Sequence, residues 1–167
     1  MISVEGIDAR NWDEIEPIYQ GFLERPIDSA EELEVWLLEL GQFDAFVSET
    51  GSMLYVEMTC DTENEKVKQA YLDFVEKVQP ELAKISDLLN RKLAESPHAD
   101  SLDSVEYNVL LRDTRMDLAI FREENIPLGT ELTKLGQRYN EICGAMTVEF
   151  DGEEKTMQQM GKYLQVN

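Results

Sequence analysis

Apolar residues recur at steps of three and four through most of this chain, which is the spacing of one face of an α-helix. The first helix is predicted from about Asn11 to Glu24, and Arg25-Pro26 ends it because the residue before proline is biased away from helical backbone. A second helix begins at Ser29, which forms a capping box with Glu32. We expect Gly51 to end that second helix.

A third and longer helix is predicted behind a second capping box, formed by Thr62 and Glu65. It should run to about Glu95, before Pro97, with a kink at Pro80. At 1.5 Å per residue such a helix is about 50 Å long, more than the ~40 Å diameter of a compact globule of this chain length. We therefore expect an elongated molecule, or helices that pack on something outside the chain.

The remaining helical segments are shorter. Two helices are predicted, at about 104–112 and 114–124, and the sequence NIPLG is expected to break the helical pattern after them. A further helix is predicted from about Thr130 to Gly144, a suitable C-terminal stop.

Near the C-terminus the apolar period changes from helical to two. Val148 and Phe150 alternate with polar residues and precede Asp151-Gly152, a sequence typical of a type I′ hairpin turn. The sequence QQMGKYLQ then begins another helix. A two-stranded hairpin is marginally stable in water, so a third strand or helices must cover it. The predicted fold class is mainly α: an elongated antiparallel helical lobe over residues 1–167, with one short β-hairpin near the C-terminus.

Charge and cysteine content narrow the functional classes. The chain has 35 acidic and 15 basic residues, a net charge of −20, which argues against binding to nucleic acid or to an anionic membrane. Cys60 and Cys143 lie in unrelated contexts, without a C-x-x-C motif. We find neither a signal peptide nor an apolar run of about 20 residues. These features predict a cytoplasmic protein with free thiols and no membrane partner.

Catalytic and metal-binding motifs are missing from the sequence. The single histidine, His98, lies three residues after Glu95, but Pro97 separates the pair from a common helix face, and we expect an exposed loop histidine. The sequence DTENEK at 61–66 resembles a calcium loop but has Lys66 where that loop requires glycine. The acidic residues of EFDGEE are expected to be solvated. No catalytic residue or metal ligand is assigned, and substrate-binding residues are unknown.

Several strings carry a resemblance that periodicity alone does not give. MTCDTENE, FREENIPLGTEL and YNEICGAMTVEFDGEEKTMQQM together resemble the N-terminal part of the oligoendopeptidase F family, zinc metallopeptidases of the thimet-oligopeptidase type. The opening WDEIEPIYQGFLERPIDSAEELEVWL fits the same pattern. The positions that match there are Trp12, Pro17, Tyr19, Leu23, Arg25, Ile27, Ser29, Leu33, Trp36 and Leu37.

The resemblance implies a helical, non-catalytic lobe that covers one side of a substrate channel in a peptidase that hydrolyses oligopeptides. In that family a zinc ion is held by an H-E-x-x-H helix and a later glutamate, and this chain contains no H-E-x-x-H. We therefore expect the chain alone to be inactive, with the catalytic domain of the same polypeptide and oligopeptide substrates as its partners. The alternative is a stand-alone acidic binding module, or truncated relative, that acts through a partner. A homodimer is also possible, through an apolar strip left exposed on the long helices.

Overall fold

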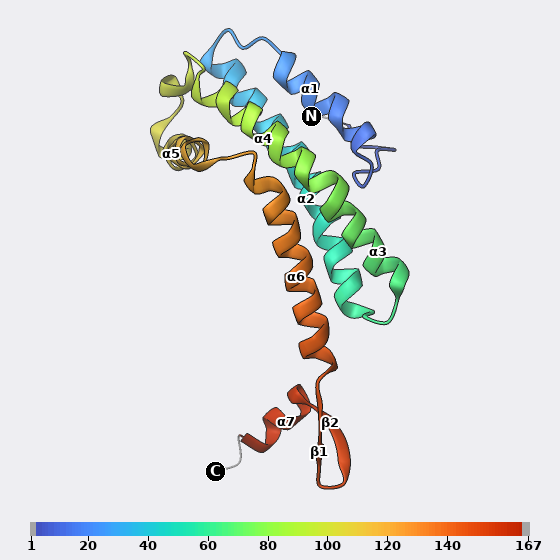
Figure 1. Cartoon of the computed structure of the whole chain (residues 1–167). Helices are drawn as coiled ribbons and strands as arrows, with labels where there is room; N and C mark the ends of the chain where they lie inside the picture. Colours follow the sequence, from blue (N-terminus) through green and yellow to red (C-terminus); the bar gives the residue numbers. More distant parts are fainter. Residues whose placement is uncertain (1–2, 165–167) are drawn as a thin grey trace. The chain divides into compact units, whose positions relative to one another are not determined.

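A computed structural model describes residues 3–164 and shows a mainly helical chain with a hairpin near its C-terminus (Figure 1), which confirms the predicted fold class. The chain divides into two compact units, Met1–Thr130 and Glu131–Asn167. The elongated shape and the assignment of the whole chain to a single lobe stay predictions. No helix in the described part of the chain is long and apolar enough to cross a membrane.

The first unit contains the long helices. In order they are α1 (Trp12–Glu24), α2 (Ala30–Cys60), α3 (Glu65–Asp73), the π-helical segment η1 (Phe74–Val78), α4 (Gln79–Ala94), the 3₁₀ turn η2 (Ala99–Ser101) and α5 (Ser104–Ile120). Helix α6 (Asn125–Ala145) leads into the second unit, followed by β1 (Thr147–Phe150), β2 (Glu153–Thr156) and α7 (Met157–Leu164).

The ends of the first helices follow from local chemistry, as predicted. Asn11 caps α1 by accepting a hydrogen bond from the backbone of Asp13, and Arg25 leaves the helix with extended backbone (ψ 123°) before Pro26. The Ser29 hydroxyl accepts a hydrogen bond of 3.1 Å from the Glu32 backbone and so begins α2.

Gly51 does not end the second helix, contrary to the prediction. Helix α2 continues through Gly51 to Cys60. A Cβ atom at this position would lie 2.7 Å from Cε1 of Phe74, so glycine is needed for the close approach of two helices. A glycine inside a helix costs only about 1 kcal/mol relative to alanine, which the tertiary contacts of a long helix offset.

The third helical region also begins and bends differently from the prediction. Its N-cap is Asn64, not Thr62, and the Asn64 side chain accepts a hydrogen bond of 3.1 Å from the Lys66 backbone. The irregularity expected at Pro80 lies just before it, as the π-helical turns of η1, where the N–H of Gln79 donates to the carbonyl of Phe74. Pro80 thus falls in the first turn of α4, where its missing N–H needs no partner.

The two helices predicted at 104–112 and 114–124 are one helix, α5, because the polar residues between them continue the turn and Thr114 is buried. The break expected at NIPLG lies earlier, at Phe121, where the backbone becomes extended (ψ 133°). Helix α6 accordingly begins at Asn125 instead of Thr130 and ends at Ala145, one residue after the predicted stop. Pro127 is tolerated because it lies in the first turn of α6.

The core of the first unit lies along α1, α2 and α4. Its largest fully buried side chains are Trp36, Tyr19, Phe22, Phe43, Ile15, Leu33, Met58, Val75 and Val78. The Phe43 ring meets Tyr19 edge to face at 4.9 Å, and the Trp36 indole N–H donates to the Phe22 carbonyl at 3.0 Å. The buried side chains of α1 and α2 thus follow the helical spacing of apolar residues in the sequence.

The predicted hairpin is present in the second unit. Asp151 (φ 56°) and Gly152 (φ 75°) both have positive φ, as a type I′ turn requires, and Phe150 pairs with Glu153 across it. Helix α7 begins with a capping box in which Thr156 and Gln159 exchange hydrogen bonds of 2.9 and 3.2 Å. The Phe150 and Tyr163 rings lie 4.7 Å apart, so α7 covers part of the hairpin.

Candidate functional site

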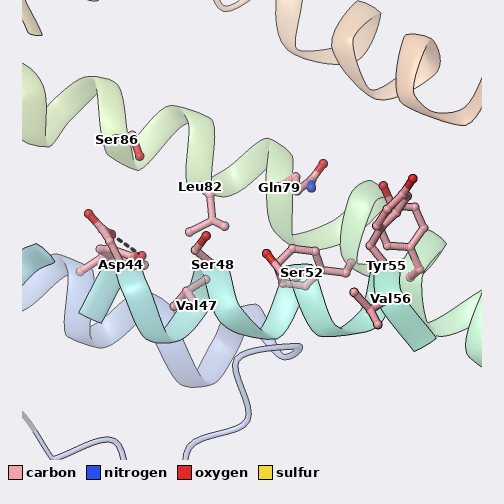
Figure 2. Close-up of a pocket in the computed structure, with 13 residues that line it drawn as sticks. Asp44, Val47, Ser48, Ser52, Tyr55, Val56, Gln79, Leu82 and Ser86 are labelled. Atoms are coloured by element: carbon pink, nitrogen blue, oxygen red, sulfur yellow. Dashed lines mark hydrogen bonds between the residues drawn. The ribbon is translucent and has the colours of Figure 1, made fainter. Parts of the chain in front are cut away.

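A cleft lined by both polar and apolar side chains lies between α2 and the α3–α4 region of the first unit (Figure 2). It has a volume of about 520 Å³. The residues that line it are Tyr19, Asp44, Val47, Ser48, Gly51, Ser52, Tyr55, Val56, Tyr71, Phe74, Gln79, Leu82 and Ser86. Three serines, three tyrosines, a glutamine and a carboxylate make this lining rich in hydrogen-bonding groups.

One face of α2 supplies most of the polar groups. Asp44, Ser48, Ser52 and Tyr55 follow one another at steps of four, four and three, which places them on the same side of the helix. Gln79, Leu82 and Ser86 repeat the arrangement on α4, on the opposite side of the cleft in Figure 2. Helix α2 therefore supplies more of the polar groups of the cleft than any other element.

Asp44 lies at one end of the cleft and is held by Tyr19. The Tyr19 hydroxyl donates a hydrogen bond of 2.8 Å to Oδ1 of Asp44. Surrounding protein atoms raise the pKa of Asp44 above its ordinary value of 3.8, an effect that the Tyr19 hydrogen bond partly offsets. Burial, followed by the neighbouring Asp44 charge, raises the pKa of Tyr19, so the phenol stays protonated as the donor.

Aromatic side chains close the other end. The Tyr55 and Tyr71 rings meet at 60° with centroids 5.6 Å apart, and burial raises the pKa of Tyr71. Phe74 occupies the space that a side chain at Gly51 would need. Since Phe74 begins the π-helical segment, the irregular turn directly shapes the cleft, and such turns occur frequently at functional sites.

The chemistry of the cleft is suited to binding. Carboxylate, hydroxyl and amide groups can accept and donate hydrogen bonds to a peptide backbone or to an amine. A serine nucleophile requires an adjacent base, and the lining contains no histidine, lysine or cysteine. The cleft therefore offers hydrogen-bonding groups for recognition.

The structure places the sequence candidates away from this cleft. His98 lies in the turn before η2 and is half-buried, not exposed as predicted, because the chain folds back there to bury Ala99. Glu95 is the C-cap residue of α4, so the pair shares no helix face. Cys60 is exposed, Cys143 is half-buried, and both are free thiols, as predicted.

The two acidic stretches hold only local interactions. In DTENEK, the Asn64 amide donates to Asp61 at 2.9 Å as the chain turns into α3. In the hairpin, Glu149, Asp151, Glu153 and Glu154 are exposed. Across residues 3–164 no group of three or more histidine, cysteine, aspartate or glutamate side chains is arranged to hold a metal ion.

Sequence reasoning missed the residues of the cleft. Asp44, Ser48 and Ser52 are unremarkable individually, and the apolar positions of α2 dominated its interpretation. The available signal was their common face: small polar residues every four positions on a long helix, next to a glycine. A pairing with Gln79 and Ser86 was not readable without the helix packing.

Comparison with models of protein families shows the family to which the chain is related. The family model described as the Peptidase M3 N-terminal domain matches residues 7–121. This chain belongs to that family. The match covers α1 to α5 and ends at Phe121, the residue that caps α5, so the whole cleft lies inside the M3 N-terminal domain. No curated protein and no solved structure matches the chain.

Peptidases of the M3 family are zinc enzymes, and the donor set of this M3 N-terminal domain does not fit a zinc site. Zinc sites need three or four nitrogen, sulfur or oxygen ligands that converge on one point. The chain has one histidine, and its described side chains form no such cluster.

Proposed function

We propose that this chain is the N-terminal, non-catalytic substrate-channel lobe of an oligoendopeptidase F-like zinc metallopeptidase, an enzyme that hydrolyses oligopeptides in the cytoplasm. The observation that carries the proposal is the family match over residues 7–121. The strings FREENIPLGTEL and GAMTVEFDGEEKT, which resemble oligoendopeptidase F, support the narrower assignment. In this proposal the zinc ion belongs to the catalytic domain of the same polypeptide.

The cleft gives the lobe a way to contact peptides. A peptide has an amide donor and acceptor at almost every residue, and hydroxyls from two helices can satisfy them without selecting a sequence. The Asp44 carboxylate can in addition accept a charge-assisted hydrogen bond from a terminal amine or a basic side chain. The high negative charge of the chain favours the approach of such cationic groups.

Peptide binding by the cleft can be tested directly. Short unstructured peptides with a free amine should shift the NMR resonances of Ser48, Ser52 and Gln79 in the full chain. Asp44→Asn should weaken this binding about tenfold, because a hydrogen bond to a charged group contributes about 1.5–3 kcal/mol. Asparagine still accepts the hydrogen bond from Tyr19, so the fold is retained.

Asp13→Asn is the matched control, because Asp13 lies in the first turn of α1, outside the cleft lining. It should leave peptide affinity unchanged. Resonance shifts that avoid the cleft, or equal binding by both variants, would contradict a role of the cleft in peptide contact.

A second candidate is a stand-alone acidic binding module that acts through a partner. It is favoured by one observation: no described side chain of α6 is buried, although the helix carries several large apolar residues. The intact mass of the native cellular product distinguishes the candidates. A mass several times 19.2 kDa, with an H-E-x-x-H segment, supports the peptidase lobe, whereas a native product of 19.2 kDa supports the module.

A further inference from the structure

Helix α6 carries an apolar stripe that the chain leaves exposed. Leu132, Leu135, Tyr139 and Ile142 are between 58% and 72% exposed. Large apolar side chains on adjacent turns of a helix form a continuous surface, and such surfaces on soluble proteins mark interaction sites. We define the α6 stripe as these four residues.

The spacing of the stripe is that of a helix that packs along another helix. Steps of three, four and three separate its members, and the same alternation reaches Leu128 four residues earlier and Met146 four residues later. Both of these flanking residues are also at least half exposed. This is the alternating three-four repeat of a coiled-coil seam, which buries against one neighbouring helix.

The residues on either side of the stripe favour an antiparallel pairing of identical helices. Glu131 and Arg138 precede Leu132 and Tyr139 on one side, and Gly129, Gly136 and Cys143 repeat every seventh residue on the other. In an antiparallel pair that stacks Leu132 on Leu135 of a second copy, Glu131 lies near Arg138 of that copy, and the reverse contact forms by symmetry. The small residues on the other side allow the helix backbones to approach closely.

The distribution of charge also favours α6 as the contact between two copies. Two copies that each carry −20 repel one another over most of their surface. Helix α6 contains two acidic residues, Glu131 and Glu141, and two basic residues, Lys134 and Arg138, so its own net charge is zero. Copies can therefore meet at α6 with much less electrostatic cost than along the acidic helices.

We propose that a second copy of this chain covers the α6 stripe from Leu132 to Tyr139, in an antiparallel helix pair with Tyr139 on Leu128 and with Glu131 near Arg138 at two symmetry-related positions. This inference goes beyond the proposed function and does not depend on it. The full chain should sediment as a monomer–dimer mixture at about 1–100 µM, since short helix pairs form interfaces at the small end of the specific range.

A charge swap within one chain tests the arrangement. Glu131→Arg and Arg138→Glu should each raise the dimer dissociation constant at least about tenfold, because each places like charges together at both symmetric contacts. The double variant restores opposite charges at both contacts and should return to within a few-fold of the original value. Gln137→Arg, on the side of α6 away from the stripe, should leave dimerisation unchanged, and circular dichroism confirms that each variant folds.

The rescue is specific to a second copy, because swapping both charges on one surface restores a contact only when that surface meets itself. A double variant as weak as the single variants would overturn the proposal. A chain that stays monomeric over the whole concentration range would also overturn it, and would assign the stripe to a different protein surface.

Discussion

At Gly51 the cleft-lining side of α2 meets the ring of Phe74 so closely that no side chain fits between them. The sequence suggested a helix end at this glycine, since glycine is frequent after the last turn of a helix. Here the missing Cβ of Gly51 has a different consequence, because it allows α2 and the helix that carries Phe74 to pack closely. This role depends on Phe74, 23 positions away, so the residues next to Gly51 in the sequence do not indicate it.

Substitution of Gly51 by alanine should destabilise the protein. The added Cβ would lie 2.7 Å from a buried ring, and we expect the free energy of unfolding to fall by about 1–3 kcal/mol. Gly41→Ala is the matched control, because a Cβ there meets nothing within 4 Å and alanine favours the helix by up to ~1 kcal/mol. Urea denaturation of both variants measures the difference, and an equal response of the two would show that Phe74 moves aside freely.

Lys92 shows how one side chain joins two elements. Its ammonium group on α4 donates hydrogen bonds of 2.8 Å to the carbonyls of Phe22 and Leu23, and a third to the carbonyl of Arg25. These carbonyls belong to the C-terminal end of α1, where the last turn leaves acceptors unsatisfied. Burial lowers the pKa of Lys92, and the nearby Arg25 charge lowers it further.

Lys92→Met keeps an unbranched apolar side chain, one atom shorter than lysine, and removes the three donors of the ammonium group. We expect the free energy of unfolding to fall by about 2–3 kcal/mol, because hydrogen bonds that involve a charged group contribute about 1.5–3 kcal/mol and their loss leaves carbonyls unpaired. Lys84→Met serves as the control, since Lys84 is exposed and its ion pair with Glu81, one turn away, contributes less than about 1 kcal/mol. Thermal unfolding that shifts equally in both variants would argue against the Lys92 contacts.

The elements differ in how far the sequence predicted them. The sequence predicted an element boundary correctly where neighbouring residues determine it. Examples are the Ser29 capping box, the Arg25-Pro26 stop and the Asp151-Gly152 turn. The predicted helix boundaries were wrong where tertiary packing determines the length of the helix. Helix α5, for example, continues through the polar residues in its middle. The cleft depends on how α2 packs against α4, and the sequence analysis, which followed the apolar positions, did not identify its polar residues.

For the molecule as a whole, the two units differ in how much core they own. All the buried apolar side chains that the structure describes belong to Met1–Thr130, whereas in the described part of Glu131–Asn167 the only buried residue is Lys155. A unit of about 40 residues or fewer seldom buries enough surface to fold stably alone. The second unit should therefore be the first part of the monomer to open.

Hydrogen exchange of dilute protein tests this difference. Amides of the hairpin, α7 and the later turns of α6 should exchange through local opening, while those of α2 and α4 should require global unfolding. Slow exchange in α2 and α4 alone would match the expectation. Equal protection in both units of a verified monomer would contradict it.

The π-helical segment between α3 and α4 has an evolutionary consequence. A π turn holds one residue more than an α turn. If η1 lost one residue and became α-helical, the side chains of α3 and α4 would still point in the same directions. Deletions elsewhere in α3 or α4 would rotate every later side chain by about 100° and pull Ile85 and Leu89 out of the core. Among relatives of this domain, insertions and deletions between the start of α3 and the end of α4 should therefore concentrate at 74–78. Relatives without the extra residue should have a differently shaped cleft.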